Sequence, residues 1–302
     1  MSGRPLASVL ITGGDGQLGQ ALRKLMPEAA AAGLCLLPVG RDEFDITAVD
    51  SVARGLDARP VAAVINAAAY TAVDRAEAEP ETAECINATG PRILAAACGE
   101  RGIGLVQVST DYVFDGCKGA PYGETDAPNP LGVYGRTKLA GEAAALTVPG
   151  AIVLRTGWVF SEFGNNFLRT MLRLGAEREA ISVVADQLGG PTYAPAIAKV
   201  LVRMLVRRMQ GRALPGGVYH LGGAPAVSWR DFAVAIFAKA REQGVLDKVP
   251  RVLPITTAQY AAAAPRPADA RMDCTRLARA LGPLENDWRQ GLGEALDALR
   301  SG

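Results

Sequence analysis

A glycine-rich segment near the N-terminus constrains the fold of this 302-residue chain more than any other feature. It spans residues 12–19, reads TGGDGQLG and directly follows the apolar run Val9-Leu10-Ile11. Glycine has no Cβ, so it accepts positive φ and lets a ligand approach the backbone closely. A helix that begins near Gly16 would point unpaired N–H groups and its dipole at an anion. The segment therefore predicts a strand, a tight turn and a helix with an anion site at its start.

The spacing of the glycines fits two patterns, GxxGxxG from Gly13 and GxGxxG from Gly14. A match of this kind also fits a tight surface turn, because the motif is informative only between a strand and a helix. Here the context is present, since an apolar run precedes the glycines and a stripe at helical spacing follows them, formed by Leu18, Leu22 and Leu25.

Short apolar runs alternate with helical patterns along the first half of the chain. The expected strands are residues 34–39, 61–65, 103–108 and 151–154, and the expected helices are 49–56, 81–101 and 134–146. Such alternation indicates a parallel sheet covered on both faces. We therefore predict an α/β fold with a Rossmann-type doubly wound parallel sheet, which binds ligands beyond the C-terminal ends of its strands.

Composition excludes several classes of protein. The formal net charge of +1 gives no sign of a nucleic-acid or anionic-membrane partner, and no apolar run reaches the length of a membrane span. Residues 1–5 hold no signal-peptide segment ahead of the first expected strand. The five cysteines form no CxxC pair, which is typical of reduced thiols. We expect a cytoplasmic protein.

The chain has one histidine, His220. A single histidine excludes a multi-histidine metal site and argues against a Ser-His-Asp hydrolase. His220 lies in the apolar run 218–221, which reads as a strand. We therefore predict a structural role for His220 and no metal site.

The end of the second expected strand bears on the choice of dinucleotide. An acidic residue there binds the ribose 2′-OH of NAD, whereas an arginine accommodates the 2′-phosphate of NADP. The chain has Val39-Gly40-Arg41-Asp42, so the arginine comes first. We predict NADPH, with NADH as a second option. The alternative is that Arg41 is a solvated loop charge and both cofactors bind; Asp45 is expected near the adenine.

Tyr134 and Lys138 lie one helical turn apart, so both face one cleft. A phenol titrates near pH 10 and needs a shift of roughly 2–3 units to exchange protons near neutral pH. A neighbouring ammonium favours the phenolate. Ser109 and Thr110, at the end of the strand 103–108, add hydroxyls that can bond a carbonyl oxygen. We predict hydride transfer between a nicotinamide and a carbonyl, with Tyr134, Lys138 and a hydroxyl of this Ser/Thr pair as the candidate catalytic groups.

Each of these features also has a purely structural explanation. Tyrosine and lysine share a helix face in many proteins, and serine or threonine often ends a strand. The glycine turn upstream favours the catalytic interpretation over both.

The chain resembles the extended short-chain dehydrogenase/reductases and, within them, the dTDP-4-dehydrorhamnose reductases. The resemblance runs nearly end to end. It is carried by GGDGQLG (13–19), NAAAYTAVD (66–74), NA (87–88), STDYVF (109–114), YGRTKLAGE (134–142), RTGWV (155–159), GNNF (164–167) and DQLGGPT (186–192). The first of these and the Tyr/Lys motif mark the superfamily, whereas STDYVF, AAYTAVD and DQxGxPT are more specific.

The resemblance implies that the protein reduces the C4 ketone of dTDP-4-dehydro-L-rhamnose to give dTDP-L-rhamnose. Tyr134 would protonate the C4 oxygen, Lys138 would tune Tyr134, and Thr110 would assist. The residues expected at the cofactor are Gly13, Gly16, Gln17, Leu18, Gly19, Arg41, Asp45, Ile46, Ala69, Tyr70, Thr71, Tyr134 and Lys138. The residues expected at the substrate are Thr110, Asp111, Trp158, Asn166 and Arg271.

Two of these substrate residues keep an alternative role. Trp158 is either a sugar contact or a core residue. Arg271 either pairs with the diphosphate, which suits a guanidinium fork, or forms a surface ion pair. Asn87 is expected to support the site without taking part in the chemistry.

The resemblance also implies a smaller α/β lobe that binds the nucleotide sugar and is interleaved in sequence with the sheet domain. The expected cofactor domain comprises residues 1–160 with a returning segment at about 190–222, where a helix at 195–208 packs back on it. The lobe then comprises residues 161–189 and 223–302. Residues 261–264 are expected to form a loop that orders around substrate.

The sequence departs from related proteins at two positions. Gly157 stands where serine is frequent, and Tyr70 where histidine is frequent; neither change removes a group that the chemistry needs. Two alternative functions stay open, namely a reductase for another dTDP-4-keto-6-deoxysugar and a non-catalytic relative that binds methionine adenosyltransferase. The expected partner is a dTDP-sugar, with a homodimer as one option for assembly.

Overall fold

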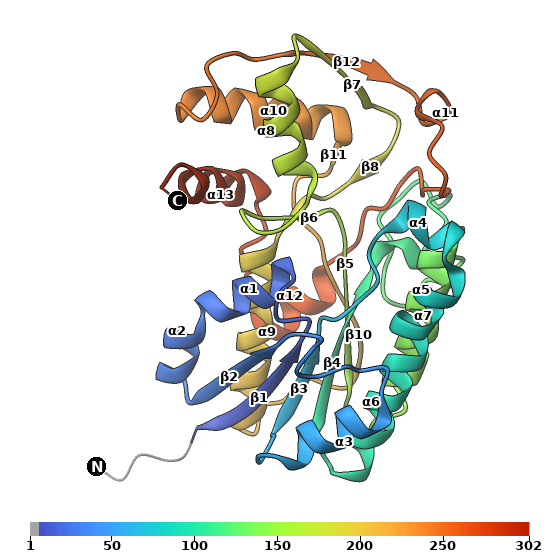
Figure 1. The fold of residues 1–302 in the computed structure, drawn as a ribbon, viewed down its shortest axis with the longest axis vertical. Coiled ribbons are helices and arrows are strands. Elements are labelled where there is room, and N and C mark those ends of the chain that lie inside the picture. The colour runs from blue at the N-terminus through green and yellow to red at the C-terminus, as the bar shows by residue number, and fades with distance from the viewer. Residues whose placement is uncertain (1–5, 302) are drawn as a thin grey trace.

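The computed structural model describes residues 6–301 (Figure 1), so the expectation for residues 1–5 lies outside it. A six-stranded sheet forms the centre, in the order β10-β5-β4-β3-β1-β2. All neighbouring strands pair in parallel. The strands are β1 (Ala7–Thr12), β2 (Leu34–Val39), β3 (Ala63–Asn66), β4 (Gly104–Thr110), β5 (Ile152–Thr156) and β10 (Gly217–Leu221). The predicted parallel sheet is confirmed.

Helices cover both faces of this sheet because side chains alternate along each strand. Val9 and Ile11 of β1 pack toward one face, and Leu10 between them packs toward the other. The first face is covered by α1 (Gln17–Lys24), α2 (Met26–Ala31), α9 (Ala194–Met209) and α12 (Thr275–Leu281). The second is covered by α3 (Val49–Asp57), α6 (Gly90–Glu100) and α7 (Val133–Ala145).

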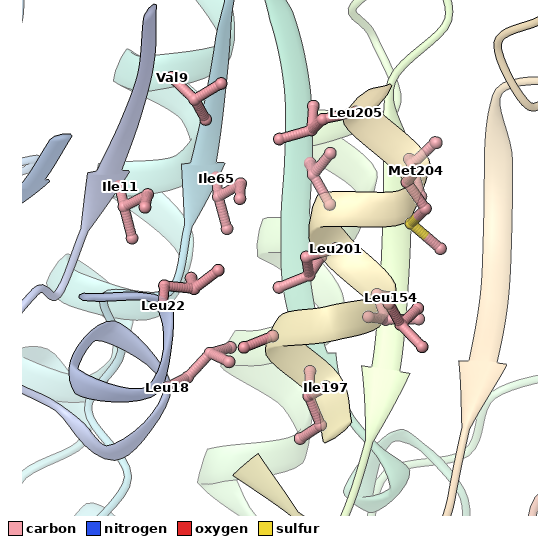
Figure 2. Close-up of a cluster of buried hydrophobic side chains, with 14 of the residues drawn as sticks. Val9, Ile11, Leu18, Leu22, Ile65, Leu154, Ile197, Leu201, Met204 and Leu205 are labelled. Atoms are coloured by element: carbon pink, nitrogen blue, oxygen red, sulfur yellow. The ribbon is translucent and has the colours of Figure 1, made fainter. Parts of the chain in front are cut away.

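The helix α9 returns to the sheet from a distant part of the chain. Figure 2 shows Ile197, Leu201 and Leu205 of α9 in one hydrophobic cluster with side chains of β1 and β3. All three α9 side chains are buried. The prediction that the helix at 195–208 packs back on the sheet domain is confirmed.

The stretch predicted as one helix over 81–101 is a helical run with a defect. It consists of α5 (Pro80–Glu84), the π-helical turn η1 (Cys85–Thr89) and α6. The short helix α4 (Val73–Ala78) precedes it. A π turn inserts one residue into the helical ladder and re-aims the side chains around it. It places Asn87 against α7, where it donates to the Thr137 hydroxyl at 3.2 Å.

The second lobe lies above the sheet in Figure 1 and has a hydrophobic core of its own. Three helices pack together in it, namely α8 (Phe167–Glu177), α10 (Trp229–Glu242) and α13 (Trp288–Ser301). Small two-stranded sheets complete it. Their strands are β6 (Val159–Phe160), β7 (Ala180–Val184), β8 (Leu188–Gly189), β9 (Thr192–Tyr193), β11 (Val227–Ser228) and β12 (Arg251–Ile255). The short helix α11 (Thr257–Tyr260) follows β12.

The division of the chain into the predicted ranges stays a prediction. One element bears on it: α12 belongs by sequence to the range predicted as lobe, yet Leu277 and Leu281 pack in the cluster that covers the sheet. Within the described part of the chain, no helix is long and apolar enough to cross a membrane.

Candidate active site

A cleft of about 830 Å³ opens at the C-terminal ends of the central strands. It is lined by the residues that follow β1 and β3, by the ends of β4 and β5, and by the first residues of α8 and α10. Open α/β sheets bind ligands at this edge. The predicted site residues on the cleft are Gly13, Gly16, Gln17, Leu18, Gly19, Arg41, Asp45, Ile46, Ala69, Thr71, Thr110, Asp111, Tyr134, Lys138, Trp158 and Asn166.

The glycine turn joins β1 to α1 at one end of this cleft. Gly13 has φ +70°, and a Cβ there would lie 2.8 Å from the backbone N of Ala68. A Cβ on Gly19 would collide with the carbonyl oxygen of Gly13. Gly16 caps α1 without a side chain, and the first turn of α1 holds no acidic residue. The residues present therefore fit the pyrophosphate of a dinucleotide, held by backbone N–H groups.

Arg41 and Asp45 stand at the rim where the ribose and adenine are expected. The side chain of Arg41 is 71% exposed, and its Nε lies 3.5 Å from a carboxylate oxygen of Asp45. Hydrogen bonds from Thr47 lower the pKa of Asp45 below its ordinary value, and Arg41 adds to this effect. Asp45 is therefore ionised at neutral pH, and Arg41 can turn toward a 2′-phosphate.

The three predicted catalytic side chains meet in the middle of the cleft. Tyr134 and Lys138 lie on α7, and Thr110 ends β4; all three are buried. The Lys138 ammonium donates to the carbonyl oxygen of Val108 at 2.8 Å. The Thr110 hydroxyl donates to Asp111 at 3.0 Å. The structure thus brings a phenol, an ammonium and a hydroxyl to one place.

Burial controls the pKa values of both Tyr134 and Lys138. Burial raises the pKa of Tyr134 to about 12, although a hydrogen bond with Thr110 opposes the rise. Burial also lowers the pKa of Lys138 to about 8, against the attraction of Glu142. Desolvation thus dominates the pKa of Tyr134 here, and the Lys138 ammonium is bonded to Val108. The expectation that Lys138, together with a bound nicotinamide, lowers the pKa of Tyr134 stays a prediction.

Asp111 and Gly157 lie in direct contact on the side of the cleft expected to hold the substrate. Asp111 is 2% exposed, and burial raises the pKa of its carboxyl to about 7. A Cβ on Gly157 would collide with this carboxylate. The departure at position 157 therefore gives Asp111 its room.

Trp158 follows in a left-handed conformation with φ +50°, which is uncommon for a residue with a Cβ. Its indole stacks on that of Trp229, with ring centroids 3.5 Å apart and an interplanar angle of 4°. Both rings line the cleft. Trp229 was not predicted, because it starts α10 far along the chain and no local motif marks it.

Thr156 is a second cleft residue that sequence reasoning left without a role. It ends β5, and only 4% of it is exposed. Within residues 6–301, its hydroxyl oxygen has no hydrogen-bond partner. Since buried polar groups are normally paired, a ligand in the cleft is the natural partner.

Asn166 links the second lobe to the glycine turn. Its side-chain amide donates to Gln17 Oε1 at 3.0 Å, and its Oδ1 caps α8 by accepting from Arg169 N–H at 3.1 Å. Ser161 also donates to Gln17 Oε1, at 2.7 Å. The amide side chain of Gln17 is thereby held at the mouth of the turn.

Two predicted site residues lie away from the cleft. The Tyr70 hydroxyl donates to Glu79 at 2.6 Å, which takes the phenol out of the site. Arg271 donates to both carboxylate oxygens of Asp269, at 2.8 and 2.6 Å. For Arg271 this is the ion-pair alternative, and the cleft gains neither side chain.

Comparison with known proteins decides the family. The family model described as RmlD substrate binding domain matches residues 7–301. The dTDP-4-dehydrorhamnose reductase of Aggregatibacter actinomycetemcomitans is 46% identical, over 95% of this chain and 97% of that protein. The chain belongs to the dTDP-4-dehydrorhamnose reductase family.

Other proteins named dTDP-4-dehydrorhamnose reductase agree with this assignment. The one from Burkholderia thailandensis is 42% identical, over 97% of this chain and 99% of that protein. A crystal structure from Bacillus anthracis, in complex with NADP, is 36% identical and superposes with a TM-score of 0.87, over 97% of this chain and 99% of that one. A structure from Clostridium acetobutylicum gives 35% and 0.88 at the same coverage. The resemblance drawn from the sequence is confirmed.

Proposed function

We propose that this chain reduces the C4 ketone of dTDP-4-dehydro-L-rhamnose to the alcohol of dTDP-L-rhamnose, with NADPH as reductant. The observation that carries the proposal is the meeting of Tyr134, Lys138 and Thr110 in a cleft that begins at the glycine turn. Membership of the dTDP-4-dehydrorhamnose reductase family supports the substrate, and the NADP in the related crystal structure supports the cofactor.

Bound NADPH supplies the hydride for C4. Tyr134 donates its phenolic proton to the C4 oxygen, so the ketone gains a hydride and a proton and becomes an alcohol. The raised pKa of Tyr134 keeps the phenol protonated at neutral pH. A general acid works best when its pKa lies near the working pH, so the phenolate that forms must be stabilised as the proton leaves. With substrate bound, the Thr110 hydroxyl would turn its proton from Asp111 to the same oxygen and orient it.

Lys138 acts on the charge that remains after proton transfer. The phenolate left on Tyr134 lies in a buried site, where a nearby ammonium stabilises it more than it would in water. The pKa of Lys138, about 8, leaves its ammonium charged at neutral pH. The same ammonium is one helical turn from Tyr134 and would also hydrogen-bond a ribose hydroxyl of the cofactor.

The remaining cleft residues divide between the two ligands. The glycine turn with Gln17, Leu18, Arg41, Asp45 and Ile46 would hold the cofactor, as would Ala69 and Thr71. Asp111, Trp158 and Asn166 would contact the sugar nucleotide. Cofactor contact by Tyr70 and diphosphate binding by Arg271 stay predictions, as do a homodimer and a cytoplasmic location.

The alternative functions differ in what they need from the site. A non-catalytic relative has no use for Tyr134, Lys138 and Thr110, and all three are present and clustered. A reductase for another dTDP-4-keto-6-deoxysugar would use the same three groups. The sugar is therefore decided by an assay with both kinds of substrate.

The test is NADPH oxidation with dTDP-4-dehydro-L-rhamnose, run with the wild type and with Tyr134→Phe. The phenylalanine lacks the proton donor, so we expect kcat to fall by at least about 10²-fold. NADPH binding, followed by fluorescence, should stay within about threefold. A matched control is Tyr260→Phe, an exposed tyrosine that does not line the cleft. Turnover by Tyr134→Phe at the wild-type rate would refute the proposed chemistry.

A further inference from the structure

A buried carboxylate that the proposed chemistry does not use lies directly beneath the catalytic residues. Glu142 is on α7, one helical turn after Lys138, so the two share a helix face. Only 2% of Glu142 is exposed. An ionised carboxylate is costly to bury, so its partners need an explanation.

Two partners come from neighbouring strands of the sheet. Arg155 of β5 forms a two-pronged ion pair, with Nε 2.9 Å from Oε1 and Nη2 2.7 Å from Oε2 of Glu142. The Ser109 hydroxyl of β4 donates to Oε1 at 2.5 Å. Ser109 and Arg155 lie opposite each other in the register of β4 and β5. Glu142 therefore fastens α7 to both strands at one level.

That level is where the catalytic groups are held. Ser109 stands between Val108, whose carbonyl oxygen accepts from Lys138 at 2.8 Å, and Thr110. A shift of Ser109 along the strand direction would move both neighbours, because they share its backbone. The Glu142 carboxylate, by holding Ser109, therefore helps to fix both the Lys138 ammonium and the Thr110 hydroxyl in place.

We infer that Glu142 is a positioning residue for the reduction: through Ser109 it fixes the end of β4, and its charge lies one helical turn from the buried Lys138 ammonium on the same face of α7. The inference rests on the proposed function for its activity readouts.

The other ionisable groups that face α7 or the partners of Glu142 come from five elements. Arg155 offsets its charge, and His220 of β10 lies 3.5 Å from Arg155. Burial lowers the pKa of His220 to about 4, so this ring is neutral in the assay range. Asp111 of η2 (Asp111–Val113) and Tyr134 of α7 face the cleft side. Glu77 of α4 accepts from the first N–H of α7, at Val133.

The direction of the effect on Lys138 follows from these charges. Lys138 is active as an ammonium, so kcat/KM in the wild type should fall as pH rises through about 8. Glu142→Gln removes a neighbouring negative charge, so this fall should move about one pH unit lower. Arg155→Gln leaves the carboxylate without its counter-charge, so the fall should move to higher pH. A purely structural role would not produce opposite shifts.

A milder variant tests the mechanical half of the inference. Ser109→Ala removes only the hydroxyl that ties β4 to Glu142 and leaves every charge in place. We expect kcat to fall about tenfold. The pH at which kcat/KM declines should stay within about 0.3 unit of its wild-type value. Glu177→Gln, on the exposed surface of α8, is the matched control and should change neither quantity.

A readout independent of turnover separates this inference from the proposed function. NMR titration of ¹³C-labelled lysine side chains, with Lys138→Met to assign the signal, follows the Lys138 ammonium directly. Opposite shifts in Glu142→Gln and Arg155→Gln support the inference even if the tested sugar is not reduced. Shifts of the same sign, or none, would overturn it, as would wild-type kcat in Ser109→Ala. If the two charge variants fail to fold, the Ser109→Ala result decides.

Discussion

At the scale of single residues, the structure bears on how Lys138 acts on Tyr134. The lysine can lower the pKa of the phenol before the reaction, or it can stabilise the phenolate that remains afterwards. Burial raises the pKa of Tyr134 to about 12, so the phenol carries its proton at neutral pH. Lys138 then matters for the phenolate that remains. Spacing alone predicted the pair but not this balance, because desolvation depends on how α7 packs against the rest of the molecule.

Arg41→Ala tests the choice between the two cofactors. The guanidinium would pair with a 2′-phosphate, and a hydrogen bond between charged groups is worth about 1.5–3 kcal/mol. We expect the Kd for NADPH to rise about tenfold and that for NADH less than about twofold. Arg59→Ala, another exposed arginine of the same domain, serves as the control. Equal losses for both cofactors would assign Arg41 to the solvated loop instead.

Thr156→Val tests whether the unpaired hydroxyl in the cleft binds a ligand. Valine has the same shape, and a hydroxyl without a partner contributes little to folding. The midpoint of urea unfolding should therefore stay the same or rise. The Kd for cofactor or the KM for substrate should rise about three- to tenfold, and Thr156→Ser should restore it. A lower unfolding midpoint with unchanged ligand affinities would contradict this role.

Local motifs located most of the candidate site. The glycine turn and the Tyr/Lys pair each lie within a few residues, so spacing alone identifies them. The sequence assigned no role to Trp229 or Thr156, for different reasons. Trp229 reaches the cleft only through the packing of the second lobe. Thr156 lies in the motif RTGWV, but only the missing hydrogen-bond partner of its hydroxyl marks it out.

At the scale of elements, hydrophobic runs located the strands but not their ends. The run at 103–108 stops before Thr110, whereas β4 continues through it, because the last residues of these strands are polar and face the cleft. Periodicity also joined residues 81–101 into one regular helix. A single extra residue in a helical turn leaves the apolar pattern almost unchanged, so the π turn at Cys85–Thr89 was invisible.

Asn87→Ala tests what that turn does. The Asn87 side chain accepts from Tyr70 N–H at 2.8 Å and donates to the Tyr70 carbonyl at 3.0 Å, in addition to Thr137. Its loss leaves buried backbone groups unpaired, so we expect a loss of about 1–3 kcal/mol in unfolding free energy. Chemical denaturation measures it. Asn165→Ala, at an exposed asparagine, is the control; equal stability of both variants would contradict the role.

At the scale of the whole molecule, an ion pair joins the two lobes across one side of the cleft. Arg266, from the loop that follows α11, donates to both carboxylate oxygens of Asp74 on α4, at 3.1 and 2.8 Å. The N–H of Ala264 bonds the same carboxylate at 3.1 Å. The segment 261–264, expected to order around substrate, is thus already tied to the sheet domain.

Asp74→Asn should loosen this connection. We expect the KM for the sugar nucleotide to rise about three- to tenfold with a smaller change in kcat, because the lobe is less often closed over substrate. Adding Arg266→Gln should produce little further loss, since both changes break one contact. Asp57→Asn, which alters an ion pair within the sheet domain, is the control. Additive effects of the two changes would show that the contact does not act as a unit.

The sequence predicted the central sheet better than the second lobe. Strand and helix alternation predicted the parallel sheet, since each crossover leaves a local signature. The second lobe came from resemblance, because its short strands and separated helices have no period to read. The position of α12 was missed for the same reason.

The return of α9 and α12 to the sheet has a consequence for dissecting this protein. A fragment that stops near residue 160 would contain the glycine turn and the catalytic residues, yet on one face of the sheet only α1 and α2 would remain, and the apolar surface that α9 and α12 cover would be exposed. Leu18, Leu22 and Ile65 would then meet water in place of α9. We therefore expect this fragment to aggregate, because the exposed apolar patch is too large for a stable separate domain.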